Sequence, residues 1–572
     1  MISSAFPQRD SRMNDYLRAT FFATANFVFV VSFVLVSAAQ QSVAQSPTPK
    51  IPRLDRALYP QAYGVLGSEN LMYPVDVSDW PVQITTEHQL FVDDYLVATC
   101  THLTRQLHQA KRHGGPVLRL LGTPWEQASS GSLIVLRDEN SGLFRMWYGI
   151  RSLVKAANGI TYRGPTCYAT STDGIHWDKP NLGIFKFGQD TNNNICLPEG
   201  SIEGLFYDPA AIDPDQRYKA MVWHDPRGQE RYAPQEGFYR YWSNDGVHWK
   251  GDNRQCLMPN GQGKNFPDQP CTGVGDATNF QWDAKLKKYV ANTKILTSDS
   301  GRMVGRCESD DLIHWTRPRM VLFRDGLDDA DSEMYEHQTF PHESLWIGQL
   351  RVMHGRKSFI PEPPIRDVRP GWKQVAIELT ASRDGANWSR VCPGELILPL
   401  GAKGSWDADY LSPMTGQPLL VGDELWFYYL GAVRWERLKA LGVPNPRDEL
   451  NPGMANDEMH IGLAKLRRDG FVSLNAGEQP GMLVTRPLTF RSGKLYVNAE
   501  IANDGYLKVE VRNADGTAVE PYRLDACEAV IGDALKAPVS WAGESKLTCP
   551  KDQCQRLAFQ LRKAKLYSFW IE

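Results

Sequence analysis

A seven-residue pattern that occurs four times constrains the fold more than any other feature of the sequence. Each copy reads Ser-x-Asp-Gly-x-x-Trp, with Leu312 in place of the glycine in the third copy. The copies begin at Ser171, Ser243, Ser309 and Ser382, which places their aspartates 72, 66 and 73 residues apart. Recurrence at a nearly constant spacing of this size is typical of an architecture built from repeated structural units.

Turn chemistry explains the pattern. Asp-Gly favours a tight hairpin, because the aspartate accepts hydrogen bonds within the turn and the glycine adopts conformations that other residues avoid. The tryptophan begins the outgoing strand, where its ring can pack between neighbouring sheets. Each copy is therefore predicted to join the outer strands of one sheet, and residues 468–471 read as a truncated fifth copy. We interpret the histidines inside the copies, His176, His248 and His314, as structural.

A second element precedes each copy: a strand, a polar turn and an aromatic-rich strand, as in residues 143–148, 217–223 and 424–429. Short segments with alternating apolar and polar residues indicate β-strands. Five units of four strands, over residues 85–478, predict a five-bladed β-propeller, whose radial repetition leaves only short sheet edges. Strand patterns with polar turns continue over residues 479–572, where we expect a C-terminal β-sandwich. The predicted fold class is all-β.

The N-terminus has the pattern of an export signal. Arg9, Arg12 and Arg18 precede an apolar run over residues 21–36, and small residues follow up to Ala44. This order is typical of a signal peptide, so we predict a signal over residues 1–44 and a linker with an N-terminal extension over 45–84. The expected location is periplasmic or secreted. An uncleaved membrane anchor is the alternative, and it is the only contact with a membrane that we expect.

Composition and charge exclude several classes of function. The chain has 63 basic and 66 acidic residues and a formal net charge of −3, without a long charge run. Neither a nucleic-acid surface nor a nucleotide site is predicted, because basic patches, a P-loop and a dinucleotide fingerprint are lacking from the sequence. No Cys/His spacing typical of a metal site occurs, so we expect no metal and no cofactor.

The hairpin copies, the segment Leu90-Phe91-Val92-Asp93 and the closing sandwich resemble exported bacterial proteins of the glycoside hydrolase family 32 and 43 type. The resemblance covers nearly the whole mature chain, but the nucleophile motif of family 32, Trp-Met-Asn-Asp-Pro, has no counterpart here. It implies a carbohydrate substrate and hydrolysis of glycosidic bonds in an extracellular poly- or oligosaccharide. The alternative is a non-catalytic glycan-binding propeller.

Glycoside hydrolysis needs two carboxyl groups that meet at the substrate, and the starts of inner propeller strands converge on a central funnel. We therefore take acidic residues near those starts as catalytic candidates: Asp208, Asp276, Glu333, Glu336 and Asp407. Glu336 or Glu333 is the expected general acid, and Asp276 or Asp407 the base or nucleophile. The resemblance implies that Asp208 stabilises the transition state. The expected substrate-binding residues are Trp125, Glu126, Tyr207, Tyr335, His337 and Trp406.

A lyase or a phosphorylase on the same fold is a third possibility. A phosphorylase needs basic residues at the funnel to bind phosphate. The starts of the inner strands carry no Arg or Lys pair, which disfavours this activity.

Overall fold

The structure is a computed structural model that describes most of the chain from residue 81 onward. The described residues are 81–120, 123–126, 128–156, 159–225, 235–252, 255–261, 273–297, 301–324, 328, 332–354, 374–402, 404–408, 410–433, 458–550 and 553–572. The predicted signal peptide and nearly all of the predicted linker lie outside them. Within this part of the chain, no helix has the length and apolar character needed to cross a bilayer.

The regular elements of the described residues are β-strands, apart from a short 3-10 turn, η5 (Pro214–Gln216), between two strands. Five antiparallel sheets of four to six strands follow one another along the chain. The strands of the first three sheets are β7 (Ala128–Arg137), β8 (Phe144–Ala156), β9 (Gly159–Arg163), β10 (Thr166–Ser171) and β11 (Ile195–Leu197); β12 (Ser201–Tyr207), β13 (Tyr218–His224), β14 (Gly237–Ser243), β15 (Lys250–Gly251) and β16 (Met258–Pro259); and β17 (Thr278–Asp283), β18 (Lys288–Thr297), β19 (Gly301–Ser309) and β20 (Arg319–Leu322).

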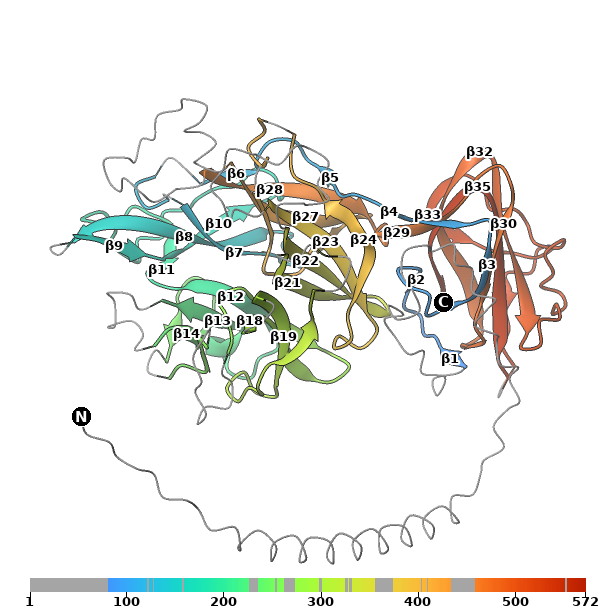
Figure 1. Ribbon diagram of the computed structural model, residues 1–572, viewed down its shortest axis with the longest axis horizontal. Coiled ribbons are helices and arrows are strands. Elements are labelled where there is room, and N and C mark those ends of the chain that lie inside the picture. Colours follow the sequence, from blue (N-terminus) through green and yellow to red (C-terminus); the bar gives the residue numbers. More distant parts are fainter. Residues whose placement is uncertain are drawn as a thin grey trace, which may run out of the picture. The chain divides into compact units, whose positions relative to one another are not determined.

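The remaining two sheets complete the predicted propeller (Figure 1). Their strands are β21 (Glu333–His342), β22 (Leu345–His354), β23 (Gln374–Ser382) and β24 (Ser389–Leu398); and β25 (Tyr410–Pro413), β26 (Leu419–Val421), β27 (Glu424–Val433) and β28 (Glu458–Arg467), which pair with β5 (Lys111–Arg112) and β6 (Leu118–Arg119). The last sheet thus takes its outer strands from the N-terminal side of the propeller. Joining the two ends of the repeat in one sheet closes the ring and removes an open edge.

The innermost strands are tied together by buried polar side chains. Asn279 on β17 donates to the carbonyl of Thr415, just after β25, at 3.0 Å, and accepts from Thr339 on β21 at 2.9 Å. The amide of Thr415 in turn donates to the carbonyl of Leu133 on β7 at 2.7 Å. These bonds join four blades around one axis, so the starts of their inner strands come close together, as the sequence predicts.

The repeated pattern forms the predicted hairpins at the ends of β10, β14, β19 and β23. In the second copy, Ser243 accepts from the amide of Gly246 at 2.9 Å, and Asp245 accepts from the amides of Val247 and His248 at 2.8 Å. His248 closes the turn, with its Nδ1 2.7 Å from the second oxygen of Asp245. The histidine of the repeat is therefore a turn residue, as interpreted from the sequence.

The same turns also connect neighbouring blades. The carbonyl of Gly246, in the second blade, accepts from the indole of Trp147 in the first blade at 2.6 Å. Tyr428 of the fifth blade donates in the same way to Gly174 of the first, at 2.7 Å. The pattern is thus used twice, to close a hairpin and to hold the adjacent blade in place.

The C-terminal strands form an 11-stranded sheet together with strands from the N-terminal side. Its strands are β1 (Val82–Gln83), β2 (Gln89–Leu90), β3 (Val97–Thr101), β4 (Thr104–Leu107), β29 (Val472–Ala476), β30 (Gly481–Thr485), β31 (Leu488–Thr489), β32 (Gly493–Asn513), β33 (Asp533–Pro538), β34 (Lys546–Leu547) and β35 (Gln555–Ile571). Phe91 is fully buried in this core, 5.8 Å from the ring of Phe569. Strands from residues 82–107 thus belong to the C-terminal sheet, although they precede the propeller sheets in the sequence.

Candidate functional site

Two β-bulges shape the starts of the inner strands. In β12, Ile202 and Gly204 pair with consecutive residues of β13, which leaves Glu203 as the extra residue. In β21, Met334 and Glu336 likewise pair with consecutive residues of β22, which leaves Tyr335 as the extra residue. A bulge re-aims the side chain that it carries and is frequent beside active sites. Both bulges lie at the end of the propeller where the inner strands begin.

The ring of Tyr335 is surrounded by three cations. The Nζ of Lys294 on β18 lies 4.6 Å from the ring centroid, and the guanidinium carbons of Arg351 on β22 and Arg302 on β19 lie at 4.3 Å and 5.2 Å. Cations over an aromatic face are attracted by the negative face of the ring. The starts of the inner strands carry no basic pair. The three basic residues around Tyr335 come instead from the second and third strands of the third blade and the second strand of the fourth blade.

Each of these cations is paired with a carboxylate that the sequence analysis selected as a catalytic candidate. The pairs are Lys294 with Asp276, Arg302 with Glu333 at 2.6 Å, and Arg351 with Glu336 at 2.9 Å. The side chains of Glu336 and Arg351 are only 5 % exposed, whereas that of Asp276 is 49 % exposed. Asp276 is therefore the carboxylate of this group that a substrate or a water molecule can reach most easily.

Glu203 completes the group and was missed by the sequence analysis. Its side chain is buried, with the residue 6 % exposed, and its carboxyl forms no hydrogen bond with any residue that the structure describes. Burial raises the pKa of Glu203 well above its usual value, and the charges of Glu336 and Asp276 raise it further, against the opposing effect of Arg351. Glu203 is consequently set up to be protonated at a pH where ordinary carboxyls are ionised.

We call this set the Tyr335 cluster: Glu203, Asp276, Lys294, Arg302, Glu333, Tyr335, Glu336 and Arg351. It unites a carboxyl with a raised pKa and carboxylates held by basic side chains. Two carboxyls whose environments favour opposite protonation states are the arrangement that acid–base catalysis requires. The structure thus brings together Asp276, Glu333, Tyr335 and Glu336 among the residues that the sequence predicts.

Glu126 and Trp125 lie in a different environment, within the first blade. The buried carboxylate of Glu126 accepts from the hydroxyl of Tyr148 at 2.7 Å and pairs with Lys179 at 2.7 Å. The indole of Trp125 donates to Asn194 at 3.0 Å. These contacts fix the segment before β7 against the outer strands of its own blade.

Asp407 and Trp406 likewise hold the segment before β25. Asp407 is buried and accepts from Arg112 of β5 at 2.7 Å and from the hydroxyl of Tyr429 at 3.0 Å. The ring of Trp406 stacks on that of Tyr429 at 5.6 Å. Arg112 belongs to the strands that close the ring, so this pair of residues ties the closure together.

His337 and Asp208 also lie apart from the Tyr335 cluster. His337 is buried, with its Nε2 2.7 Å from the hydroxyl of Thr380 and its ring 4.5 Å from that of Trp388, and burial lowers its pKa to about 3. Asp208 is exposed after the far end of β12, where it accepts from the amide of Ala210 at 3.1 Å. It stands five positions after Glu203 along this extended segment, a distance of about 16 Å.

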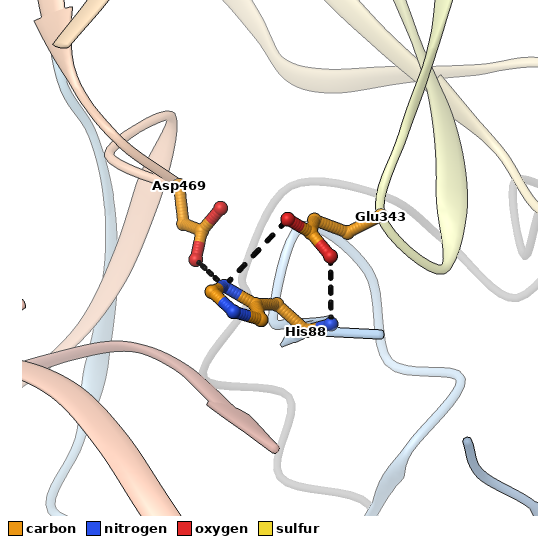
Figure 2. Close-up of side chains that lie close together, drawn as sticks. All are labelled: His88, Glu343 and Asp469. Atoms are coloured by element: carbon orange, nitrogen blue, oxygen red, sulfur yellow. Dashed lines mark hydrogen bonds and ion pairs between the residues drawn. The ribbon is translucent and has the colours of Figure 1, made fainter. Parts of the chain in front are cut away.

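A second cluster of ionisable residues involves His88, Glu343 and Asp469 (Figure 2). Their potential ligand atoms lie within 4.8 Å of one another, the spacing of a possible metal site. Nδ1 of His88 is 2.6 Å from Asp469 and 3.9 Å from Glu343, and the ring of His88 stacks on Trp570 of β35 at 3.8 Å.

Protein groups already engage every carboxylate oxygen of this cluster. Asp469 accepts from Ser568 at 2.7 Å and lies 2.9 Å from Nε2 of His342, in addition to His88. Glu343 accepts from Arg468 at 2.8 Å and from the amide of His88 at 3.1 Å. We therefore interpret the group as a hydrogen-bonded junction between the last propeller hairpin and the C-terminal sheet, and call it the Asp469 junction.

The sequence matches no protein-family model, and no curated protein matches it. Solved structures with similarity include a glycoside hydrolase, which is 10 % identical with a TM-score of 0.40 over 62 % of this chain and 92 % of that one. An N-acetylgalactosamine deacetylase from F. plautii is 15 % identical, with a TM-score of 0.39 over 65 % and 97 %. A beta-1,2-mannobiose phosphorylase from Listeria innocua is 10 % identical, with a TM-score of 0.37 over 63 % and 96 %. At these scores the likeness carries no argument about activity, and membership of family 32 or 43 stays a prediction.

Proposed function

We propose that the chain is an exported enzyme that hydrolyses glycosidic bonds of a poly- or oligosaccharide at the Tyr335 cluster. The observation that carries the proposal is Glu203, a buried carboxyl with a raised pKa beside the carboxylates Asp276 and Glu336. Glycosidases need one protonated and one ionised carboxyl at the same bond. In this proposal Glu203 supplies the protonated carboxyl, and the carboxylates expected from the sequence supply the ionised one.

In this mechanism Glu203 donates its proton to the oxygen of the leaving sugar. Asp276 acts on the opposite face of the sugar ring, as the base that activates water or as the nucleophile. We assign this role to Asp276 because its side chain is half-exposed, while Glu336 is enclosed by Arg351, Gln338 and Ser412. Glu203 thus takes the role of general acid that was expected for Glu336 or Glu333, whereas Asp276 keeps the role of base or nucleophile that was expected for it or Asp407.

Glu336 and Arg351 are positioning residues in this account. Arg351 donates to the hydroxyl of Tyr410 at 2.6 Å, pairs with Glu336 and lies over Tyr335. It thereby links the fourth and fifth blades at the funnel. The charge of Glu336 raises the pKa of Glu203, so the pair also tunes the proposed acid.

A hydrolysis screen tests the proposal. Protein lacking residues 1–44 would be incubated with plant and algal polysaccharides and with aryl glycosides, beside the Glu203→Gln and Asp208→Asn variants. The two residues belong to the same inner-strand segment, so Asp208→Asn is a matched control at its far end. We expect sugar release from polysaccharides by the parent and by Asp208→Asn, and release at least about 10²-fold slower by Glu203→Gln. Equal release by parent and Glu203→Gln would contradict the assignment of the acid.

Phosphorolysis is the second candidate, favoured by the three cations around Tyr335. Lys294, Arg302 and Arg351 could bind a phosphate oxygen each if the anion displaced a carboxylate partner. Running the screen with and without inorganic phosphate separates the candidates. Free sugar in phosphate-free buffer supports hydrolysis, while a sugar phosphate formed only with phosphate supports phosphorolysis. Glycan binding without any product would support the non-catalytic alternative.

Export is proposed from the N-terminal pattern. If a signal is removed after Ala44, protein produced in a bacterial host should appear outside the cytoplasm and begin at Gln45. Mass spectrometry of the N-terminal peptide tests this directly. An intact N-terminus in the membrane fraction would instead support the uncleaved anchor.

A further inference from the structure

Arg302 of the Tyr335 cluster has an unused pair of hydrogen-bond donors. Its Nη1 donates to Glu333 at 2.6 Å, whereas its Nε and Nη2 donate to no residue that the structure describes. These two N–H groups point the same way from the planar guanidinium, and two parallel donors of this kind bind both oxygens of a carboxylate at once. Arg302 therefore keeps a complete carboxylate-binding edge, formed by Nε and Nη2, without an acceptor.

Arg390 on β24 shows what the same edge binds when an acceptor is present. Its Nε and Nη2 donate to the two carboxylate oxygens of Glu378 at 2.8 Å each, and its Nη1 donates to Asp328 at 2.7 Å. One guanidinium thus holds two carboxylates in this fold. Arg302, with Glu333 on its Nη1, reproduces half of that arrangement, and a second carboxylate would complete it.

The missing acceptor is costly at this position. Nε of Arg302 is buried without a hydrogen bond, and a buried donor that lacks an acceptor lowers the stability of the fold. Arg383 avoids this cost, because its Nε and Nη2 donate to the two oxygens of Asp93 at 3.0 and 2.7 Å. The side chain of Arg302 is nonetheless 36 % exposed, so an acceptor that arrives with a ligand can reach the guanidinium.

The free edge belongs to the proposed active site. The guanidinium of Arg302 and the Nζ of Lys294 lie over the same ring, that of Tyr335, at 5.2 and 4.6 Å from its centroid. Lys294 is the ion-pair partner of Asp276, the proposed base or nucleophile. A sugar held for attack by Asp276 therefore has Arg302 close beside it.

The charge of the site does not exclude an anionic sugar. Each of the three cations of the Tyr335 cluster pairs with one carboxylate, and Glu203 is set up to be protonated, so the cluster has no net negative charge. A sugar hydroxyl is a single acceptor for the edge of Arg302. The carboxylate of a uronic acid instead offers two oxygens at the spacing of the two donors.

We propose that Arg302 selects an acidic glycan, by binding the carboxylate of a uronic acid residue through Nε and Nη2 while Nη1 stays paired with Glu333. The substrate is then a uronate-containing poly- or oligosaccharide rather than a neutral one. That a sugar carries the carboxylate rests on the proposed function. Arg302 determines specificity in this account, whereas Glu203 and Asp276 act on the glycosidic bond.

Carboxyl reduction provides matched pairs of ligands for the test. Oligosaccharides of polygalacturonate, alginate and glucuronoxylan would be compared with the same oligosaccharides after reduction of their uronic acids to neutral sugars. Calorimetry would measure their binding to mature protein carrying Glu203→Gln, in which cleavage is slow and which we call the reference protein.

Three further substitutions are added to the reference protein. Arg302→Gln removes the charge and the paired donors, and Arg302→Lys keeps the charge alone. Arg319→Gln is the control, because Arg319 on β20 is an exposed arginine of the same blade and forms no ion pair with the described residues. Thermal unfolding verifies that all four proteins are folded.

We expect at least one acidic oligosaccharide to bind the reference protein and the Arg319→Gln control at least about tenfold more tightly than its reduced form does. Arg302→Gln should weaken binding of the acidic form about 10- to 100-fold more than binding of the reduced form. The affinity of Arg302→Lys for the acidic form should fall between these values, since lysine lacks two parallel donors.

Equal affinity of the reference protein for acidic and reduced forms, or no binding of any acidic form, would overturn the inference. An equal loss of both forms in Arg302→Gln would also overturn it, by giving Arg302 a purely structural role through Glu333. Inorganic phosphate that binds more tightly than every acidic oligosaccharide, and only with Arg302 present, would assign the edge to phosphate instead.

The inference and the proposed function fail separately, because binding is measured here without turnover. A protein that binds and cleaves neutral glycans alone would refute only the uronate. Acidic glycans that are bound through Arg302 but never cleaved would refute only hydrolysis.

Discussion

Glu203 and Asp469 are both buried carboxyl residues of the propeller, yet their environments are opposite. Asp469 is contacted by His88, His342 and Ser568, and hydrogen bonds from the two histidines outweigh the effect of burial and hold its pKa well below the usual range. Glu203 has no hydrogen-bond partner among the described residues, and burial with nearby negative charge raises its pKa. A carboxylate with all its partners stabilises the fold, whereas a carboxyl without them is available for chemistry.

The comparison predicts that a substitution of Glu203 lowers activity, whereas a substitution of Asp469 lowers stability. The larger effect is expected at Glu203. Glu203→Gln removes the proposed proton donor but keeps the shape of the side chain, so kcat should fall by about 10²–10⁴-fold. The free energy of unfolding should stay within about 1 kcal/mol of the parent, because no hydrogen bond is lost. Steady-state kinetics and urea unfolding measure both quantities. A variant that is unstable but active would reverse the assigned roles.

Asp469→Asn should act on stability and leave the chemistry intact. Breaking a buried charged network costs about 3–5 kcal/mol, so the midpoint of urea unfolding should fall clearly, with kcat at 20 °C unchanged. The pKa of Asp469 is lower in the folded than in the unfolded protein. Its ionised carboxylate therefore adds to the free energy of unfolding above the unfolded-state pKa of about 3.9, and this stabilisation is lost as the pH falls through the folded-state pKa. The stability gap between parent and variant should therefore narrow below about pH 4. A gap that widens in acid would contradict the lowered pKa.

Glu336→Gln sharpens the comparison by changing the environment of Glu203 rather than Glu203 itself. The activity of a general acid is lost as pH rises through its pKa, so the basic limb of the kcat/KM profile reports Glu203. Removing the charge of Glu336 lowers the pKa of Glu203, and the basic limb should move down by roughly one pH unit. A merely structural role for Glu336 would reduce activity at every pH and leave the limb in place.

Asp173→Asn should have the smallest effect and serves as a control for Asp469→Asn. Asp173 occupies the equivalent position in the first hairpin, where the hydrogen bond from His176 and those from the turn amides lower its pKa, but its side chain is 47 % exposed. Exposed charged pairs contribute about 0–1 kcal/mol, so the unfolding midpoint should shift little. If Asp173→Asn lost as much stability as Asp469→Asn, the turn contacts of the aspartate, rather than its burial, would determine how much stability the substitution removes.

The fold could be predicted because its signal is local. An Asp-Gly turn needs only seven neighbouring residues, and four copies at similar spacing predict the blades without any knowledge of long-range contacts. The closure of the ring by β5 and β6, and the pairing of β1 to β4 with the C-terminal strands, could not be predicted in this way. These contacts join residues more than 300 positions apart, and the short strands involved have no distinctive pattern.

The candidate site was predicted only where its residues stand at the start of an inner strand. Asp276, Glu333 and Glu336 were found for this reason. Glu203 also stands near the start of its inner strand, Ser201–Tyr207, but it was missed because Asp208, just after the same strand, was taken as the acidic candidate of that blade. A Cβ on Gly204 would lie 2.5 Å from the Phe280 side chain, so the glycine permits close packing beside the bulge. Arg351 faces Glu336 only through the register that the Tyr335 bulge sets.

The dependence of Glu203→Gln activity on the leaving group tests the central claim most directly. Glycosides of the sugar identified by the screen would be compared, from the dinitrophenyl glycoside, whose leaving group departs without protonation, to the phenyl and methyl glycosides, whose leaving groups need it. If Glu203 is the general acid, the variant should cleave the dinitrophenyl glycoside at close to the parental rate and lose about 10²–10⁴-fold on the poor leaving groups. An equal loss across the series would contradict proton donation by Glu203.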